Sequence, residues 1–246
     1  MRPLLLTALG LLLSAPAFAQ QTDPGLSGAA AQANLNALTA GAPTVVPRGT
    51  SEGVKGSPYA DSRWRMAQIT LSNRVPLAPV PIKYDVLERR LLMRKAAPSL
   101  DSLQLDDRLV QQFVLLNPST GGRAARPQIF RRFAEAPEGA DRTSYVEVLH
   151  QGKYTLLKRH RRTLKKANLQ GAYSSGSQYD EIEDHSDYFL GTANAPAQPV
   201  KLALKPLQQA APALAEALKT AVAAQHPRTD ADWSLVLDLA DPAAAK

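Results

Sequence analysis

Two β-rich runs on either side of a short turn constrain the fold of this chain more than any other feature. The runs are 143–150 and 153–160, and the Gln-Gly pair at 151–152 places glycine where a two-residue hairpin turn favours a positive φ. With this turn, Leu149 pairs with Tyr154, and both faces of the hairpin carry apolar side chains. A hairpin with two apolar faces is expected near the centre of a sheet.

Further short segments rich in β-formers flank this hairpin and predict an antiparallel sheet. We expect strands at 64–71, 77–85, 87–95, 100–105, 109–116, 129–133, 188–191 and 200–204. Segment 77–85 contains prolines, which have no N–H to donate to a β-ladder. Pro79 and Pro81 therefore predict that this strand lies at an edge or becomes regular only from Ile82.

The chain changes to helical periodicity after about residue 205. Pro206 predicts a short turn at 206–210, and Pro212 predicts the start of a helix that runs to about Gln225. Thr229 and Asp232 resemble a capping box. The helix that follows is supported by apolar residues at helical spacing, which are Trp233, Val236, Leu237 and Ala240.

These patterns predict a mainly β fold, α+β at the margin, in a single domain. The antiparallel β-rich domain is expected at 59–204, the helical segment at 205–240 and a frayed terminus at 241–246. Residues 20–58 are rich in Ala, Gly, Thr and Pro and predict a flexible leader, in which nothing is expected to anchor a helix.

The amino terminus has the pattern of a secretory signal peptide. An arginine at position 2 precedes an apolar run at 4–13, and Ala17-Phe18-Ala19 offers the small-x-small motif of a cleavage site. The run is too short for a membrane-spanning helix, which needs about 20 apolar residues. We therefore expect cleavage after Ala19 and a soluble, exported protein, periplasmic or extracellular, without a transmembrane segment.

One segment concentrates positive charge in a chain whose formal net charge is +7. Its residues are the candidates for an anion-binding site, and they are Lys158, Arg159, Arg161, Arg162, Lys165 and Lys166. An acidic stretch at 180–187 offers the alternative that the two segments neutralise each other across neighbouring strands. Nucleic acid is not expected as a partner, because an exported protein is separated from the nucleic acids of the cell and no aromatic residues lie among these cations.

Local catalytic and metal-binding motifs are not found in the sequence. The chain has no cysteine, and its four histidines lack the spacing of a zinc site, so surface or helix-capping histidines are expected. No phosphate-binding glycine loop occurs, and the glycines around Ser174 do not fit a nucleophile elbow. The acidic stretch lacks the spacing of a calcium loop. The sequence therefore assigns no catalytic, cofactor or metal residue, and aromatic side chains are expected in the core.

Several short motifs resemble an uncharacterised family of exported bacterial proteins with no known activity. The motifs are Gly56-Ser57-Pro58-Tyr59, Trp64, Lys83-Tyr84-Asp85-Val86, Leu91-Leu92, Tyr145-Val146-Glu147-Val148-Leu149, Lys153, Leu156-Leu157-Lys158 and Tyr188-Phe189-Leu190. The resemblance spans 56–222. It implies export and one β-rich domain, and it implies no site residue.

The sequence does not identify a function, but it favours one class. We expect a non-catalytic binding or assembly module of the cell envelope, whose partner is an anionic envelope component or another envelope protein. The alternative is a hydrolase whose site assembles from distant strands and leaves no local motif. A pocket that brings together two carboxylates, or a His, an acid and a Ser, would favour the hydrolase.

Overall fold

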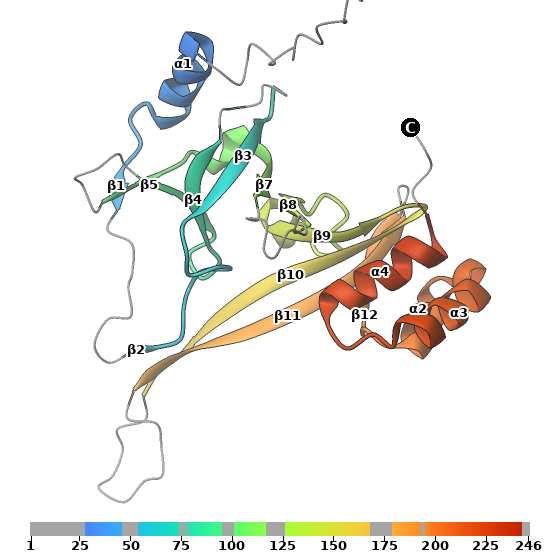
Figure 1. The fold of residues 1–246 in the computed structure, drawn as a ribbon. Coiled ribbons are helices and arrows are strands. Elements are labelled where there is room, and N and C mark those ends of the chain that lie inside the picture. The colour runs from blue at the N-terminus through green and yellow to red at the C-terminus, as the bar shows by residue number, and fades with distance from the viewer. Residues whose placement is uncertain are drawn as a thin grey trace, which may run out of the picture.

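The computed structural model describes residues 28–45, 54–73, 77, 79–94, 101–116, 126–167, 179–192 and 195–242. Within them, one open sheet of twelve strands is followed by a carboxy-terminal helical segment (Figure 1), which confirms the mainly β class. The predicted signal peptide at 1–19 lies outside the described residues.

The sheet is built from strands of very different length. They are β1 Thr44–Val45, β2 Val54–Lys55, β3 Arg65–Leu71, β4 Val80–Asp85, β5 Arg90–Arg94, β6 Ser102–Gln104, β7 Val110–Leu115, β8 Gln128–Arg132, β9 Tyr145–Gln151, β10 Tyr154–Lys165, β11 Asp180–Thr192 and β12 Ala195–Val200. Two short 3₁₀ helices, η1 Asp107–Leu109 and η2 Gly139–Thr143, interrupt the series.

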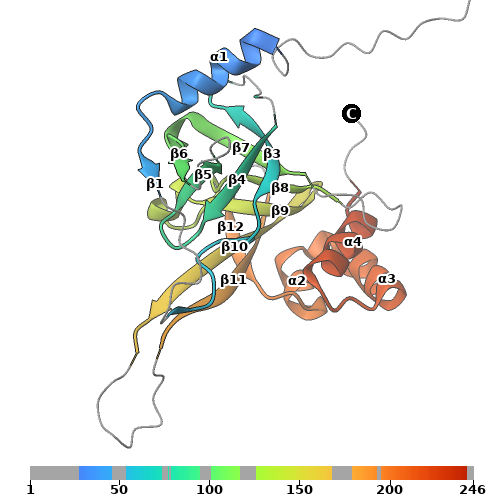
Figure 2. The ribbon, with the colours of Figure 1, turned by 60° about the vertical axis from the view of Figure 1, so that its left-hand side comes forward.

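Neighbours in the chain are mostly neighbours in the sheet. The order is β1-β6-β5-β4-β3-β7-β8-β9-β10-β11-β12, all antiparallel, and β2 adds a short parallel pairing to β11. Figure 2 shows that the first strands curl around a common interior, whereas β10 and β11 extend away from it as a long two-stranded arm. β9 and β10 have neighbours on both sides, as their two apolar faces predict.

Aromatic rings fill the interior of the curled part of the sheet. Phe113 and Phe130 stack at 4.8 Å between ring centroids, and the rings of Tyr84 and Tyr145 meet them edge-on. All four side chains are buried, as expected for large rings that contribute most to apolar burial.

The segment expected to be a flexible leader contains regular structure, which corrects the prediction for 20–58. Helix α1 Gly28–Thr39 lies over the curled sheet (Figure 2), and its Leu38 is buried in the same core as Ile69. Leu35 packs beside it, three residues earlier on the same face of the helix. Two leucines in an Ala-rich sequence thus anchor this helix.

The helical segment begins one residue before the predicted boundary at 205. It consists of α2 Leu204–Ala210, the 3₁₀ turn η3 Pro212–Leu214, α3 Ala215–Gln225 and α4 Asp230–Ala240. Residues 206–210 are therefore helical and not a simple turn, and Pro212 opens a 3₁₀ turn three residues before α3. The capping box of Thr229 and Asp232 is present, which confirms that prediction.

These helices cover one end of β9, β10 and β11 with a second core. Trp233, Val236, Leu237 and Ala240 of α4 are buried there, as their spacing predicts. Leu149, Leu156 and Leu190 supply the strand side of this core.

The prediction of an edge position for β4 is wrong. β4 lies between β3 and β5, and it begins at Val80, two residues before Ile82. Its pairing with β3 covers 80–82 and its pairing with β5 covers 82–85. Pro81 therefore lies where the strand has a neighbour on only one side, so its missing donor does not interrupt a two-sided ladder.

The register of the β9–β10 hairpin also differs from the prediction. Gln151 pairs with Thr155 and His150 with Leu156, and an irregularity follows before Leu157 pairs with Val148. Asp241, the residue that follows α4, packs against this turn. The Tyr154 N–H donates to Oδ2 of Asp241 at 2.7 Å, and a Cβ at Gly152 would lie 2.5 Å from the Asp241 carbonyl oxygen. Glycine is needed here for this close approach.

Candidate functional site

The predicted anion-binding residues do not form one surface, because successive side chains of a strand point to opposite faces. Lys158 and Arg162 share with Leu156 and His160 the face of β10 that lies toward α4, which we call the cleft face. Arg159, Arg161 and Lys165 lie on the opposite face, and Lys166 follows the end of the strand.

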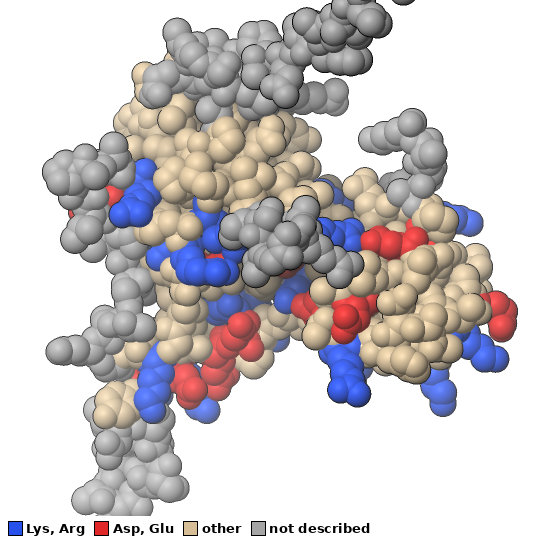
Figure 3. All heavy atoms as spheres, viewed as in Figure 1, with Lys and Arg blue, Asp and Glu red and all other residues tan. Residues whose placement is uncertain are grey.

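The cations on β10 face the acidic residues of β11. Twelve consecutive residue pairs, from Tyr154↔Thr192 to Lys165↔Glu181, align the two strands. Arg159 bonds Asp187 at 2.9 Å and Lys165 bonds Glu183 at 3.5 Å, and Arg162 pairs with Asp184. In Figure 3 the blue and red side chains lie next to one another along this arm. The arrangement is that of mutual neutralisation.

The cleft face of β10 forms the floor of a cleft of about 590 Å³, and the first half of α4 forms one wall. β8, β9 and β11 widen the floor with Gln128, Glu147 and Ser186, and the apolar lining includes Ala231 and Leu235 of α4. The sheet and the helical segment thus enclose a site that neither forms alone.

A histidine and a glutamate lie paired at the centre of the cleft floor. His160 Nε2 and Glu147 Oε2 are 2.8 Å apart, and the side chains are 9% and 8% exposed. Gln128 Nε2 donates to the second Glu147 oxygen at 3.0 Å. Burial raises the pKa of Glu147, but the hydrogen bond and charge of His160 outweigh it and hold this pKa below its usual value. His160 therefore contacts a buried carboxylate and is itself only 9% exposed, so the prediction of a surface histidine is wrong for it.

A second pair joins the floor to the start of α4. Lys158 Nζ lies 2.5 Å from Oδ2 of Asp230, and the Tyr188 hydroxyl donates to the other carboxylate oxygen at 2.7 Å. Burial raises the pKa of Asp230, but the bonds from Lys158 and Tyr188 hold it below its usual value. Burial and the neighbouring carboxylate both raise the pKa of Tyr188, so the tyrosine stays a neutral donor.

Arg162 closes the end of the cleft away from α4. Its guanidinium donates to the carbonyl oxygens of Ser57 and Tyr59 at 3.1 Å each, and it pairs with Asp184. Segment 54–60 crosses the arm closely there: Gly56 has φ 90°, and a Cβ would lie 2.5 Å from the Ile182 carbonyl oxygen.

A buried histidine holds the other end of α4 against the sheet. His150 is 1% exposed, with Nδ1 2.6 Å from Asp238 and Nε2 3.3 Å from Asp241. Ser234 donates to the Leu149 carbonyl oxygen near the middle of the helix. The prediction of surface or capping histidines is wrong for His150 as well, whereas His226 does end α3.

The chemistry of the cleft is that of matched charges. Lys158, His160 and Arg162 each pair with a carboxylate, and Arg126 at the rim pairs with Asp238. In the described ranges no three His, Cys, Asp or Glu side chains are grouped so as to hold a metal ion. The arrangement offers a ligand many directed donors and acceptors beside an apolar wall.

Sequence reasoning identified the acidic stretch that contains Asp184 but missed the two other acids of this site, Glu147 and Asp230. Glu147 stands in an otherwise apolar run, and an isolated acid among buried strand residues indicates a buried partner. Asp230 gave no such signal, because its contact with Lys158 depends on how α4 docks on the sheet.

No family model matches the chain, and no curated protein or solved structure matches it either. Among the described residues, no helix is both long enough and apolar enough to cross a membrane.

Proposed function

We propose that this chain is a non-catalytic binding module and that it holds its ligand in the cleft between the sheet and α4. The pairing of the ionisable side chains around the cleft supports this proposal most directly. A catalytic acid or base must be able to exchange its proton with a substrate, whereas Glu147 is committed to His160 and Asp230 to Lys158 and Tyr188. Fixed pairs instead present donors and acceptors in constant directions.

The hydrolase remains the second candidate because of one observation. Ser186 lies directly across the β-ladder from His160, so a serine, a histidine and the Glu147 carboxylate share the cleft floor. However, His160 contacts Glu147 through Nε2, and in the described structure no side-chain hydrogen bond joins the other ring nitrogen to Ser186. A serine nucleophile needs such a bond to lose its proton.

We further propose that the protein works in the cell envelope. The pattern of a charged start, an apolar run and Ala17-Phe18-Ala19 supports export, as does the resemblance to exported bacterial proteins. The mass of the exported protein tests this: loss of the first nineteen residues is expected, and an intact amino terminus would refute cleavage after Ala19.

A cleft-filling variant tests the binding proposal. Ala231→Trp places a large side chain in the cleft from an exposed position near the start of α4, and Ala223→Trp on the exposed side of α3 is its matched control. Tagged proteins are incubated with envelope extract, recovered and analysed by mass spectrometry. We expect a component that the original chain and the Ala223→Trp variant retain and the Ala231→Trp variant loses. Equal recovery by all three would contradict the proposal.

The same extracts separate binding from hydrolysis. If the cleft only binds, the component is recovered without chemical change, and no product that has gained a water molecule accumulates. Accumulation of such a product with the original chain and its absence with His160→Gln would establish the hydrolase instead.

A further inference from the structure

A second pocket, away from the cleft, is lined by arginines that the sequence scatters over more than fifty positions. Its volume is about 390 Å³, and it lies among the turn after β4, η1, the end of β8 and η2. We call it the arginine pocket, and its lining residues are Arg89, Asp107, Arg108, Arg132, Arg142 and Thr143.

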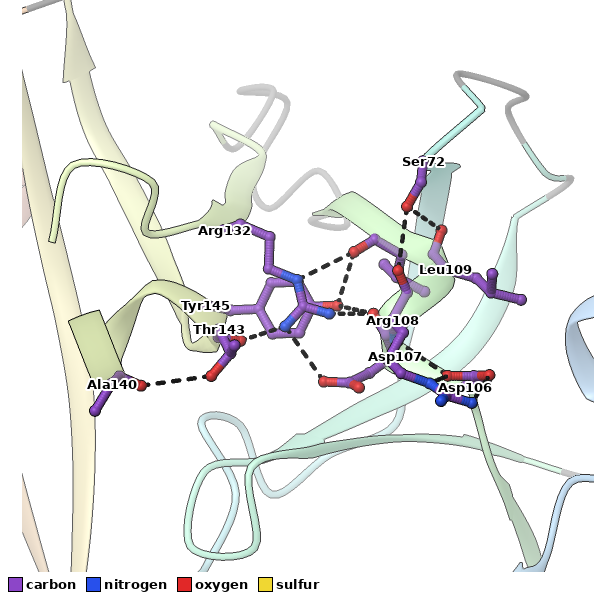
Figure 4. Close-up of polar contacts among 10 residues, drawn as sticks. Ser72, Asp106, Asp107, Arg108, Leu109, Arg132, Ala140, Thr143 and Tyr145 are labelled. Atoms are coloured by element: carbon purple, nitrogen blue, oxygen red, sulfur yellow. Dashed lines mark hydrogen bonds and ion pairs between the residues drawn. The ribbon is translucent and has the colours of Figure 1, made fainter.

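Arg132 forms a fixed side of this pocket. Its guanidinium lies 4.1 Å from the centre of the Tyr145 ring and donates from Nε to the Val110 carbonyl oxygen at 3.3 Å. Further bonds reach the carbonyl oxygens of Thr143 and Asp107, as Figure 4 shows. These contacts with backbone and ring hold the guanidinium in place without neutralising its charge.

Tyr145 supports this arrangement from below. It is 1% exposed, and its hydroxyl donates to the Val110 carbonyl oxygen at 3.1 Å. Burial raises the pKa of this hydroxyl, so it remains a neutral donor and Arg132 stacks on an uncharged ring.

The arginine pocket contains far less negative than positive charge. Asp107 is its single acidic lining residue, and its carboxylate is 3.3 Å from Arg132. Arg108 is bound by Asp106, a neighbour outside the lining, at 2.8 Å. Arg89 and Arg142 are exposed, and neither forms an ion pair with a carboxylate in the described ranges.

Guanidinium groups that converge in this way match one ligand chemistry. Like charges in one pocket repel each other, and a bound anion of high charge relieves that repulsion. Guanidinium presents paired N–H donors that fit the oxygens of a phosphate group, which is why arginine is common in phosphate sites. The volume exceeds that of a phosphate group and leaves room for a small attached moiety.

We propose that the arginine pocket binds a phosphate group of a small molecule or a lipid headgroup. The site is separate from the cleft and does not depend on its function. Arg132 supplies a fixed positive charge and one remaining Nη2 N–H. Arg89 and Arg142 supply the charge and the paired donors that a ligand completes. Thr143 also lines the pocket.

Calorimetry on the mature chain at low ionic strength tests this proposal, with inorganic phosphate and glycerol 3-phosphate as probes. The variant is the double substitution Arg89→Gln, Arg142→Gln, which removes two exposed side chains. The control is Arg161→Gln, Lys165→Gln, which removes the same charge from two exposed residues of the arm. We expect the Kd for glycerol 3-phosphate to rise about tenfold or more in the variant. The control and Ala231→Trp should keep the original Kd within about twofold.

Vesicles distinguish the source of the phosphate. Binding to phosphatidylglycerol vesicles but not to soluble phosphates, lost in the variant alone, assigns the pocket to a lipid headgroup. Binding to glycerol 3-phosphate without vesicle binding assigns it to a soluble phosphate ester. Absence of binding to every probe, or equal loss in the variant and the arm control, would overturn the proposal.

Discussion

The arm formed by β10 and β11 and the arginine pocket are both rich in cations, but they differ in what faces those cations. On the arm, Arg159, Arg162 and Lys165 each meet an acidic residue of the neighbouring strand. In the arginine pocket, Arg132 and Arg108 each pair with an aspartate, whereas Arg89 and Arg142 pair with no carboxylate in the described ranges. A conspicuous basic run in the sequence is therefore largely neutralised, whereas arginines spread through the sequence converge.

The comparison of the arm with the arginine pocket shows that the positive potential of a surface depends on whether acidic side chains lie beside its cations. A strand sends alternate residues to opposite faces, so a continuous basic run is divided before any ligand can meet it. The antiparallel register then sets Arg159 and Arg162 opposite acids of β11, and on the cleft face Asp230 of α4 supplies the acid that pairs with Lys158. The arginine pocket lies among turns and 3₁₀ helices, where no strand partner supplies matching acids.

The largest expected effect comes from breaking the buried pair of Glu147 and His160 in the cleft floor. Glu147→Leu removes the carboxylate that faces His160, and the histidine is left buried without its charged partner. We expect a loss of about 3 kcal/mol in the free energy of unfolding, measured by urea denaturation. Glu183→Gln, on the exposed pair with Lys165, should leave the midpoint unchanged. If both substitutions have equal effects, burial does not govern the strength of these pairs.

Acid should weaken the matched pairs and leave the arginines charged. Because the pKa of Glu147 is lowered in the folded chain, its contribution to stability is complete above its usual value of 4.5 and is lost as pH falls through the lowered value. The pKa of Asp230 is also lowered, from its usual value of 3.8, so its contribution to stability is likewise lost in acid. Urea midpoints measured from pH 7 to about pH 3 should therefore fall in acid. The midpoints should fall less steeply with pH for Glu147→Leu. If the midpoint of this variant has the same dependence on pH as that of the original chain, protonation of Glu147 does not contribute to the loss of stability in acid.

The sequence predicts the elements that depend on local spacing. The capping box of Thr229 and the apolar repeat from Trp233 are complete within a few residues, so α4 was predicted with its buried face. The β9–β10 hairpin was predicted in outline for the same reason. Its register was not, because local spacing does not include the contact of Asp241, which lies about ninety residues away and docks on Tyr154 and Gly152.

The cleft and the arginine pocket depend on contacts between distant segments. Lys158 was singled out for its charge, but its partner Asp230 belongs to a helix whose docking the sequence does not specify. Leu38 anchors α1 only because the curled sheet offers a buried position for it. Arg89 and Arg142 carry no pattern at all in the sequence, and topology alone brings them together.

A single substitution should convert part of the arm into the type of surface that the arginine pocket presents. Asp187→Asn removes the carboxylate shared by Arg159 and Arg161. We expect a cost below about 1 kcal/mol, together with salt-sensitive retention on an anionic column. Glu181→Gln makes the same change in net charge at an exposed position of β11 and should increase retention less. Equal gains would mean that net charge, and not the loss of the carboxylate that Arg159 and Arg161 share, controls retention.

A small effect is also expected for Arg161, a weakly paired member of the matched arm. Its guanidinium is 3.6 Å from Asp187 and 55% exposed, so water already solvates its charge. Arg159 bonds both Asp141 and Asp187 and lies 5.2 Å from the centre of the Phe189 ring. Arg161→Gln should therefore cost between 0 and about 0.5 kcal/mol, and Arg159→Gln about 1.5 kcal/mol. Urea denaturation of the two variants measures the difference in the free energy of unfolding. If Arg161→Gln costs as much as Arg159→Gln, the stabilisation by charge pairs on the arm does not depend on their burial.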